Sequence, residues 1–258
     1  MNIKSQTRLI ESLGLAAPPA RRVTRGRAGV STNKSAKDEK VSGFIAGGNM
    51  VAFPDDIPSA SRSAVTLSLL LAQEAAKGDP VAISPDLWVE RHDMVLRSLG
   101  WVSTGGATQY TEYKKVNLSV HQAILPLLAA ALGPAATAGA LIITGLTQLQ
   151  EIDKDKPWIT LFDKESRRFD HSEYRFVTAE KQDSSILLRV VAFRFAAKAQ
   201  RFQVLFFKTK DVEIEFTVAT RTLAANTDML EKLRIPLEAK LEDRANQLIN
   251  AIDLPAFA

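Results

Sequence analysis

Residues 124–146 read ILPLLAAALGPAATAGALIITGL and form the centre of a segment, 116–150, that contains no Asp, Glu, Lys or Arg. A Gly133-Pro134 pair interrupts this segment, and such a pair ends a helix because proline lacks the backbone donor and glycine weakens helical structure. The pattern therefore predicts two helices, 118–132 and 134–151, joined by a turn. Each is shorter than the ~20 residues that a single membrane span needs.

This predicted helical hairpin has three alternative locations: the core of the fold, a bilayer that it enters conditionally, or a bilayer that it occupies permanently. The core is favoured, because Thr137, Thr144, Gln148 and Glu151 form a polar stripe at helical spacing. Burying the Leu, Ile and Val side chains of this region contributes on the order of 15 to 30 kcal/mol as an upper bound. The candidate membrane or core site consists of Ile124, Leu127, Leu128, Gly133, Pro134, Leu141, Ile142 and Leu146.

Two amphipathic helices are predicted before the hairpin. In residues 59–78 the leucines recur at helical spacing, and Ser59 or Ser61 is placed to cap the first turn. In residues 85–99, Ser84 is placed as the cap and a proline follows it. The residues expected to face the core are Leu67, Leu70, Leu71, Leu87, Met94, Val95 and Leu99.

After residue 172 the apolar period changes from helical spacing to two, which predicts an antiparallel meander over 172–222. A further hairpin is predicted at 43–53, where Gly47 and Gly48 permit a tight turn. The segments around 186–193 and 204–207 are apolar on both sides, so we expect central strands covered on one side by helices and on the other by further protein or a partner. The candidate strands are 174–180, 185–195, 201–210 and 212–223.

The C-terminal region is predicted to be an amphipathic helix over 227–253. Asn226 or Thr227 is placed to cap it, and Pro236 predicts a kink. Its apolar stripe comprises Leu237, Leu241, Leu248 and Ile252. Packing on the protein's own sheet and binding of a protein partner are both open.

The N-terminal residues 1–40 are predicted to be a flexible basic arm. They hold nine Lys and Arg against three acidic residues, so this segment carries +6 of a chain whose net charge is +4. Its Pro, Gly, Ser and Thr content lacks apolar periodicity beyond a short helix at the start. The arginines proposed for docking or targeting are Arg21, Arg22, Arg25 and Arg27.

The sequence contains no motif that indicates catalysis, a metal or a cofactor. The absence of cysteine excludes a disulfide framework, a thiol nucleophile and Cys-ligated metals. His92 and His171 each neighbour an aspartate, but adjacent side chains point in different directions, so neither pair is assigned as a catalytic dyad. An aromatic and arginine stretch, 164–175, is open as a phosphate or nucleic-acid contact or as a charged loop entering a strand. No catalytic residue, metal ligand or cofactor is predicted.

The sequence thus predicts the α+β class, with a single domain over 41–258. A helical part, 59–151, packs on the sheet part, 172–222, and the C-terminal helix closes the domain. We expect a cysteine-free soluble protein without a signal peptide or stable transmembrane segment, located in the cytoplasm or delivered by another route.

The leading functional hypothesis is a non-enzymatic interaction protein, of toxin-like or secreted effector type, that engages a membrane surface or a protein partner. The basic arm would serve as its targeting or docking segment. A nucleic-acid-associated protein that uses the same arm, and an enzyme whose site is not visible in the sequence, are the alternatives. Homo-oligomer formation is also open.

Overall fold

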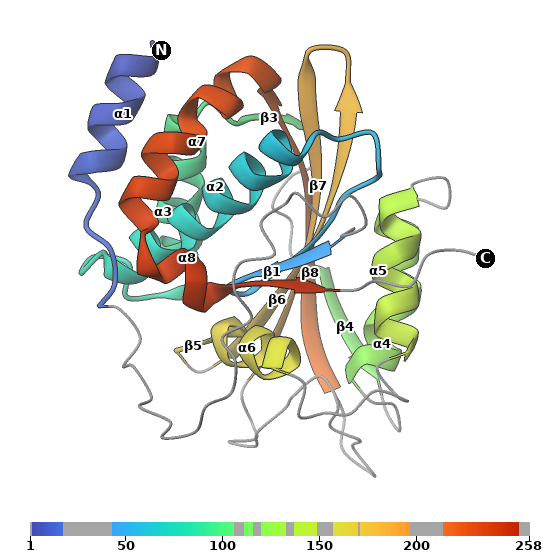
Figure 1. Ribbon diagram of the computed structural model, residues 1–258. Helices are drawn as coiled ribbons and strands as arrows, with labels where there is room; N and C mark the ends of the chain where they lie inside the picture. Colours follow the sequence, from blue (N-terminus) through green and yellow to red (C-terminus); the bar gives the residue numbers. More distant parts are fainter. Residues whose placement is uncertain are drawn as a thin grey trace, which may run out of the picture.

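A mixed β-sheet runs through the middle of the protein in the computed structural model (Figure 1). The structure describes residues 2–17, 43–105, 111–115, 120–132, 137–148, 157–169, 171–196 and 214–252. The strands follow the order β3-β8-β7-β6-β2-β1-β9, with β4 also beside β8 and β5 beside β6. Their bounds are β1 Gly43–Ala46, β2 Asn49–Ala52, β3 Val102–Gly105, β4 Thr111–Lys115, β5 Arg167–Arg168, β6 His171–Gln182, β7 Ser185–Ala196, β8 Ile214–Asn226 and β9 Ile249–Ile252.

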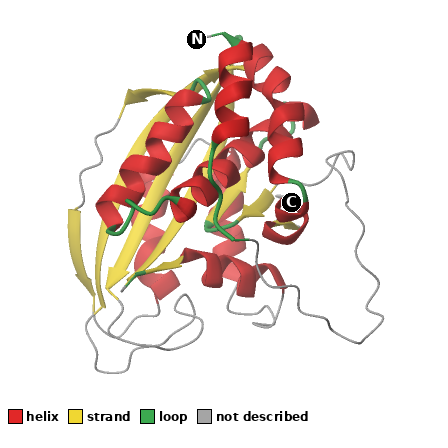
Figure 2. Ribbon diagram, turned by 90° about the vertical axis from the view of Figure 1, so that its left-hand side faces the viewer, coloured by secondary structure: helices red, strands yellow, loops and turns green. Residues whose placement is uncertain are grey.

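Helices cover both faces of this sheet. One layer, formed by α1, α2, α3, α7 and α8, lies over the face that Figure 2 turns toward the viewer, and α4, α5 and α6 lie against the other face. Together with the mostly antiparallel strand pairs, this arrangement confirms the predicted α+β class. The helix bounds are α1 Ile3–Ser12, α2 Ser59–Gly78, α3 Pro85–Ser98, α4 Val120–Leu132, α5 Thr137–Gln148, α6 Pro157–Ser166, α7 Thr227–Leu241 and α8 Asp243–Leu248.

The two-layer cover explains why the central strands are apolar on both sides. In β7, Leu188 and Val190 belong to the core under α2 and α7, whereas Val191 and Phe193 belong to the core under α4 and α5. Alternate residues of a strand point to opposite faces, so both sets are buried. From the sequence we expected the helices of 59–151 to form one layer and the second face of the sheet to be covered by further protein or a partner. Instead the chain divides its own helices between the two faces.

The predicted hairpin at the start of the domain is present as β1 and β2, which pair antiparallel. Gly47 has φ 58°, and a Cβ atom there would lie 2.2 Å from the Gln73 side chain, so glycine is required on both grounds. β2 then pairs parallel to β6, which joins this hairpin to the long meander strands. The predicted third meander strand, 201–210, lies outside the described residues.

The predicted C-terminal helix ends earlier than expected. Asn226 caps α7 as predicted, accepting a hydrogen bond from the Met229 backbone N–H, and Pro236 lies within the helix. At Glu242 the backbone turns to φ 39° and ψ −122°, and after α8 the chain forms strand β9 beside β1. The prediction of helix through 253 is therefore wrong for residues 249–252, because an open sheet edge offers these residues backbone hydrogen bonds that a local pattern does not reveal.

Replacing Glu242 with glycine is expected to raise the free energy of unfolding by about 1 kcal/mol, because only glycine adopts this backbone conformation without strain. Urea unfolding provides the measurement. Glu90→Gly is the matched control at an exposed site inside α3, where glycine should destabilise by about 1 kcal/mol. Equal effects at the two sites would contradict strain at Glu242.

The N-terminal helix belongs to the folded body. Ile10 in α1 and Leu13, which follows it, are buried against the core, and α1 contacts α7. Residues 2–17 thus correct the predicted boundary of the arm at residue 40, because this short amphipathic helix buries its apolar face. Residues 18–42, which include Arg21, Arg22, Arg25 and Arg27, lie outside the described residues.

The helices α2 and α3 match their predicted ranges with differences in detail. Ser84 caps α3 as expected, but α2 starts after Pro58 without a side-chain cap, and Ser61 donates to Glu231 instead. Leu87 and Met94 are exposed. Their places toward the core are taken by other residues of α3, namely Trp88, His92 and Leu96.

Candidate functional site

The predicted helical hairpin appears as α4 and α5, which contact each other and pack on β2, β6 and β7. Of the eight candidate residues in the segment, five are buried in the core between these helices and the sheet, and Leu127 is half-buried. Gly133 and Pro134 lie outside the described residues. The five buried residues are Ile124, Leu128, Leu141, Ile142 and Leu146.

The other side of the helix pair is also apolar. Leu125, Leu127 and Ile143 are partly exposed, and Ala130 is exposed. The polar groups of the described part are hydroxyls such as Thr147, which donates to the Ile143 carbonyl within its own helix. Neither helix contains an Asp, Glu, Lys or Arg residue. The pair is therefore apolar toward the sheet and mostly apolar toward the outside, where Thr144 and Thr147 add hydroxyl groups.

Apolar contacts hold this pair on the sheet. Opposite it stand aromatic side chains of the central strands, including Phe176 and Phe193, whose ring centroids lie 5.9 Å apart. Among the side chains described for residues 123–132 and 138–147, no hydrogen bond or ion pair reaches the sheet. The attachment depends on the hydrophobic effect and packing, which have no fixed direction.

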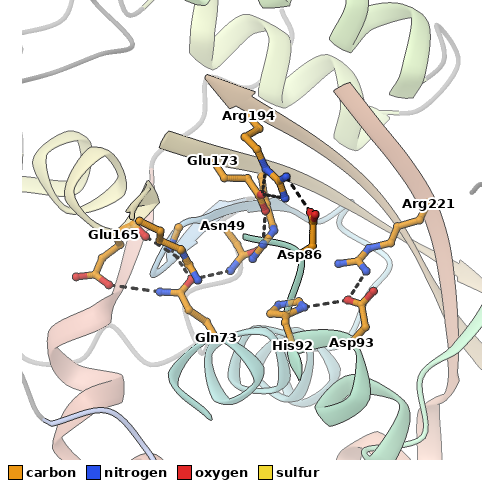
Figure 3. A network of polar contacts seen from close by, with 12 residues as sticks. Asn49, Gln73, Asp86, His92, Asp93, Glu165, Glu173, Arg194 and Arg221 are labelled. Carbon is orange, nitrogen blue, oxygen red and sulfur yellow. Dashed lines mark hydrogen bonds and ion pairs between the residues drawn. The ribbon is translucent and has the colours of Figure 1, made fainter. Parts of the chain in front are cut away.

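The opposite face of the sheet contains a buried polar network under α3 (Figure 3). Glu173 of β6 forms ion pairs with Arg175 and, at 3.1 Å, with Arg194 of β7. Burial by itself would raise the pKa of Glu173, but the charges of Arg175 and Arg194 lower it to about 2. Arg194 also reaches Asp86 of α3 at 3.2 Å. Helix α3 is thus joined to the sheet by charged groups.

A second branch of the network joins α3 to β8 through Asp93, which His92 also contacts within α3. The Nδ1 atom of His92 lies 3.2 Å from the Asp93 carboxylate, which also pairs with Arg221. Burial would raise the pKa of Asp93, but the His92 hydrogen bond and the Arg221 charge hold it below its usual range. The two groups are adjacent in sequence and bond to each other, which the sequence did not predict.

Trp88 lies at the centre of the cationic part of the network. The guanidinium carbons of Arg168 and Arg175 lie 3.6 and 4.3 Å from its ring centroid, and the His92 ring stacks at 5.0 Å. Burial and the charge of Arg175 lower the pKa of Arg168 to about 9. Cation–π contacts therefore replace solvent around two of the arginines.

A separate polar cluster fixes the β1–β2 turn. The Gln73 side chain of α2 accepts from the Gly48 backbone N–H at 2.9 Å and donates to Glu165 of α6 at 3.3 Å. Lys77 pairs with Glu165 and with Glu74. This cluster joins helices from both layers at one end of the sheet.

The residues of the 164–175 stretch are mostly engaged inside the protein. Arg175 is buried, the Tyr174 hydroxyl donates to Asp163, and Arg167 pairs with the same carboxylate. Burial and the charge of Asp163 raise the pKa of Tyr174. The phosphate or nucleic-acid interpretation of this stretch does not fit the buried positions of Arg175 and Tyr174.

The described residues offer little space for a ligand beside the network. A cavity of about 10 Å³ between α3 and the sheet is lined by Glu173, Arg175 and Arg221, which leaves room for about one water molecule. The described residues contain no group of three or more His, Asp or Glu side chains arranged for a metal ion. His92 and His171 are both buried, His92 in α3 and His171 at the start of β6. None of the described helices combines the length and apolarity that a membrane crossing requires.

Sequence comparison finds no matching family model and no matching curated protein. Three solved structures show a distant likeness. The activated Cyt2Ba monomer of Bacillus thuringiensis subsp. israelensis is 17% identical, over 67% of this chain and 94% of its own, with a TM-score of 0.39. A delta-endotoxin is 14% identical over 84% and 96%, and the Evf virulence factor is 12% identical over 98% and 92%, each with a TM-score of 0.35. These scores assign neither a fold family nor an activity to this chain.

The charged network was not predicted from the sequence, although one signal for it was present. Glu173 and Arg175 occupy the same strand face as Val177 and Ala179, which point into the core under α2. Charged residues in phase with core residues predict buried ion pairs. Their partners in α3, β7 and β8 come from distant segments, and no local pattern identifies them.

Proposed function

We propose that this protein engages membranes, as a toxin-like or effector protein, by moving the α4–α5 pair from its stored position on the sheet into lipid. The observation that carries the proposal is that this pair contains no Asp, Glu, Lys or Arg and is mostly apolar on both sides, while apolar contacts alone hold its described side chains. Such a segment suits two environments, a protein core and a lipid layer.

The energetics of the exchange support this role. In water, each buried Leu or Ile of the pair stabilises the stored position by about 1.5 to 3 kcal/mol. Lipid tails are as apolar as leucine, so this stabilisation is retained when the helices leave the sheet for lipid. No described hydrogen bond to the sheet is broken in the process. Helix α3 differs, because leaving its position separates partly buried ion pairs such as Asp93 and Arg221.

The length of the helices limits how deep they enter. The 13 residues of α4 extend about 20 Å, less than the ~30 Å hydrocarbon thickness of a bilayer. Entry into one leaflet fits this length. Departure of the helices also uncovers the aromatic face of the sheet, including Tyr174 and Phe195, so the exchange is favourable only where lipid contacts that face as well.

The basic segment with Arg21, Arg22, Arg25 and Arg27 supplies the attraction to a membrane in this proposal. Juxtamembrane arginines contribute about 1 kcal/mol each near an anionic surface. We therefore expect stronger binding to anionic than to neutral liposomes, and a loss of that difference at high salt.

The test follows the position of α4 directly. The chain contains no cysteine, so Ala130→Cys gives a single site for an environment-sensitive fluorophore on the exposed side of α4. Liposomes should shift its emission to the blue, as lipid replaces water. The same label at Ala239→Cys, an exposed alanine of α7 in the other helical layer, should not shift.

Dye release from neutral and anionic liposomes at pH 7.5 and 5 completes the experiment with the full-length protein. Release together with a shift at Ala130 alone supports the proposal. Release without that shift would move membrane activity to another element. Absence of binding, release and shift under all four conditions would make α4 and α5 ordinary core helices.

A further inference from the structure

His92 is enclosed between α3 and the sheet in a setting that disfavours a second proton. Its side chain is 1% exposed, and its ring stacks on Trp88. The Nδ1 atom faces the Asp93 carboxylate, which can only accept, so Nδ1 carries the hydrogen of the neutral ring. The Nε2 atom is buried without a hydrogen-bond partner among the described residues. A proton added at Nε2 would therefore have no acceptor.

The charges that surround His92 act on its protonation in both directions. From α3 itself Asp93 favours the charged ring, while Arg175 of β6 and Arg221 of β8 disfavour it. Glu173 is engaged with Arg175 and with Arg194 of β7. Arg168 of β5 lies over the Trp88 ring, and its own pKa is influenced by Glu74 of α2 and Glu165 of α6. Burial is the largest cause, and together these effects lower the pKa of His92 to about 3.

We propose that His92 makes the docking of α3 acid-sensitive: α3 stays on the sheet at neutral pH, and its release is favoured as the pH falls from about 6.5 to 5. While α3 is docked, the His92 ring is enclosed and neutral. Once α3 opens, His92 meets water and binds a proton, so acid stabilises the open form. Release uncovers the charged strip of the sheet, with Glu173, Arg175 and Arg221, and the apolar side of α3.

The direction and the pH window of this effect follow from the difference in proton binding between the docked and the open form. A free histidine binds its proton near pH 6.5, whereas enclosed His92 does so only near pH 3. Between these values the open form carries one more proton, so its population rises as the pH falls. From pH 7.5 to 5 the opening equilibrium should increase roughly 30-fold. Protonation of Asp93 and Glu173 affects the opening equilibrium only at lower pH, because carboxyl groups exposed to water titrate near pH 4.

The experiment measures the unfolding midpoint in urea at pH 5, 6 and 7.5, together with protection of a buried cysteine introduced at Leu96 of α3. Wild-type protein should lose stability as the pH falls to 5, and the cysteine of the Leu96→Cys variant should react faster at pH 5 than at pH 7.5 with a disulfide reagent that works in acid. His92→Gln should abolish both changes, since glutamine stays neutral. His171→Gln, a buried histidine on β6, should retain them. Acid loss that persists in His92→Gln would overturn the proposal.

A second measurement needs no variant. The C2 proton of the His92 ring, observed by NMR in the wild-type protein, should show no titration between pH 7.5 and 5 in the folded state. A titration near pH 6.5 would show that the enclosed ring accepts a proton, and this result would also overturn the proposal. Neither measurement involves a membrane, so each outcome is independent of the proposed function.

Discussion

Ala130→Asp is expected to reduce dye release from liposomes by about 100-fold at pH 7.5 while the protein stays folded. Ala130 lies on the exposed side of α4, so the new carboxylate remains in water in the stored position. If α4 enters lipid, the same charge must enter with it. A charged side chain at the centre of a membrane helix costs about 2.5 to 3.5 kcal/mol, which corresponds to roughly two orders of magnitude.

Ala239→Asp on α7 is the matched control for this prediction. It places the same charge at an exposed alanine of a helix in the other layer, with a similar loss of helix propensity. Release should then match wild type. If both variants release dye equally well, α4 does not enter lipid; if both fail and also unfold earlier in urea, the loss reflects stability. Urea midpoints measured for both proteins distinguish these results.

Glu173→Ala should destabilise the protein by about 3 to 5 kcal/mol, the largest stability effect expected for a single site in the network. The Glu173 side chain is 4% exposed, and its removal leaves Arg175 and Arg194 without their shared carboxylate. An unpaired charge in a buried position is strongly unfavourable. Because total stabilities of domains are about 5 to 15 kcal/mol, this change should be evident in urea unfolding at pH 7.

Asp86→Ala tests whether burial is the reason. Asp86 contacts the same Arg194 guanidinium, but its side chain is 86% exposed. Water screens that pair, so its loss should cost less than about 1 kcal/mol. Equal effects of the two substitutions would contradict the assignment of Glu173 as the buried centre of the network.

The pH dependence of the free energy of unfolding should also show the contribution of Glu173. Because the Glu173 pKa is lowered from 4.5 to about 2 in the folded protein, the unfolded chain takes up this proton first as the pH falls. The stability that Glu173 provides is therefore complete above pH 4.5 and is lost as the pH approaches 2. Glu173→Ala should show a shallower pH dependence across this window.

Much of the local structure was predictable from short sequence patterns. The period-two segments 174–180 and 185–195 became β6 and β7, and the Gly133-Pro134 interruption separated two helices as expected. Ser84 and Asn226 marked two helix starts. These features depend on neighbours within a few residues, and backbone geometry fixes such relations.

The long-range arrangement was less predictable. The strand β9 arises from residues that also fit a helical stripe, because Leu248 and Ile252 satisfy both patterns over such a short length. The short helix α1 was predicted, but its docking on α7 was not. Both depend on a surface that exists only after the rest of the chain has folded.

By itself, the sequence determined that this chain has an uncharged helical pair, a set of two-sided apolar strands and a basic N-terminal region. These are properties of composition and periodicity. The tertiary structure decided that, among the described helices, α4, α5 and α6 lie on one face of the sheet, while α3 is joined to the other face through the ion pairs of Asp86 and Asp93 with Arg194 and Arg221. The physical reason is that a hydrophobic pattern depends on residues close together in the sequence. The partner of a buried charge depends instead on which distant segments the fold brings within a few ångströms.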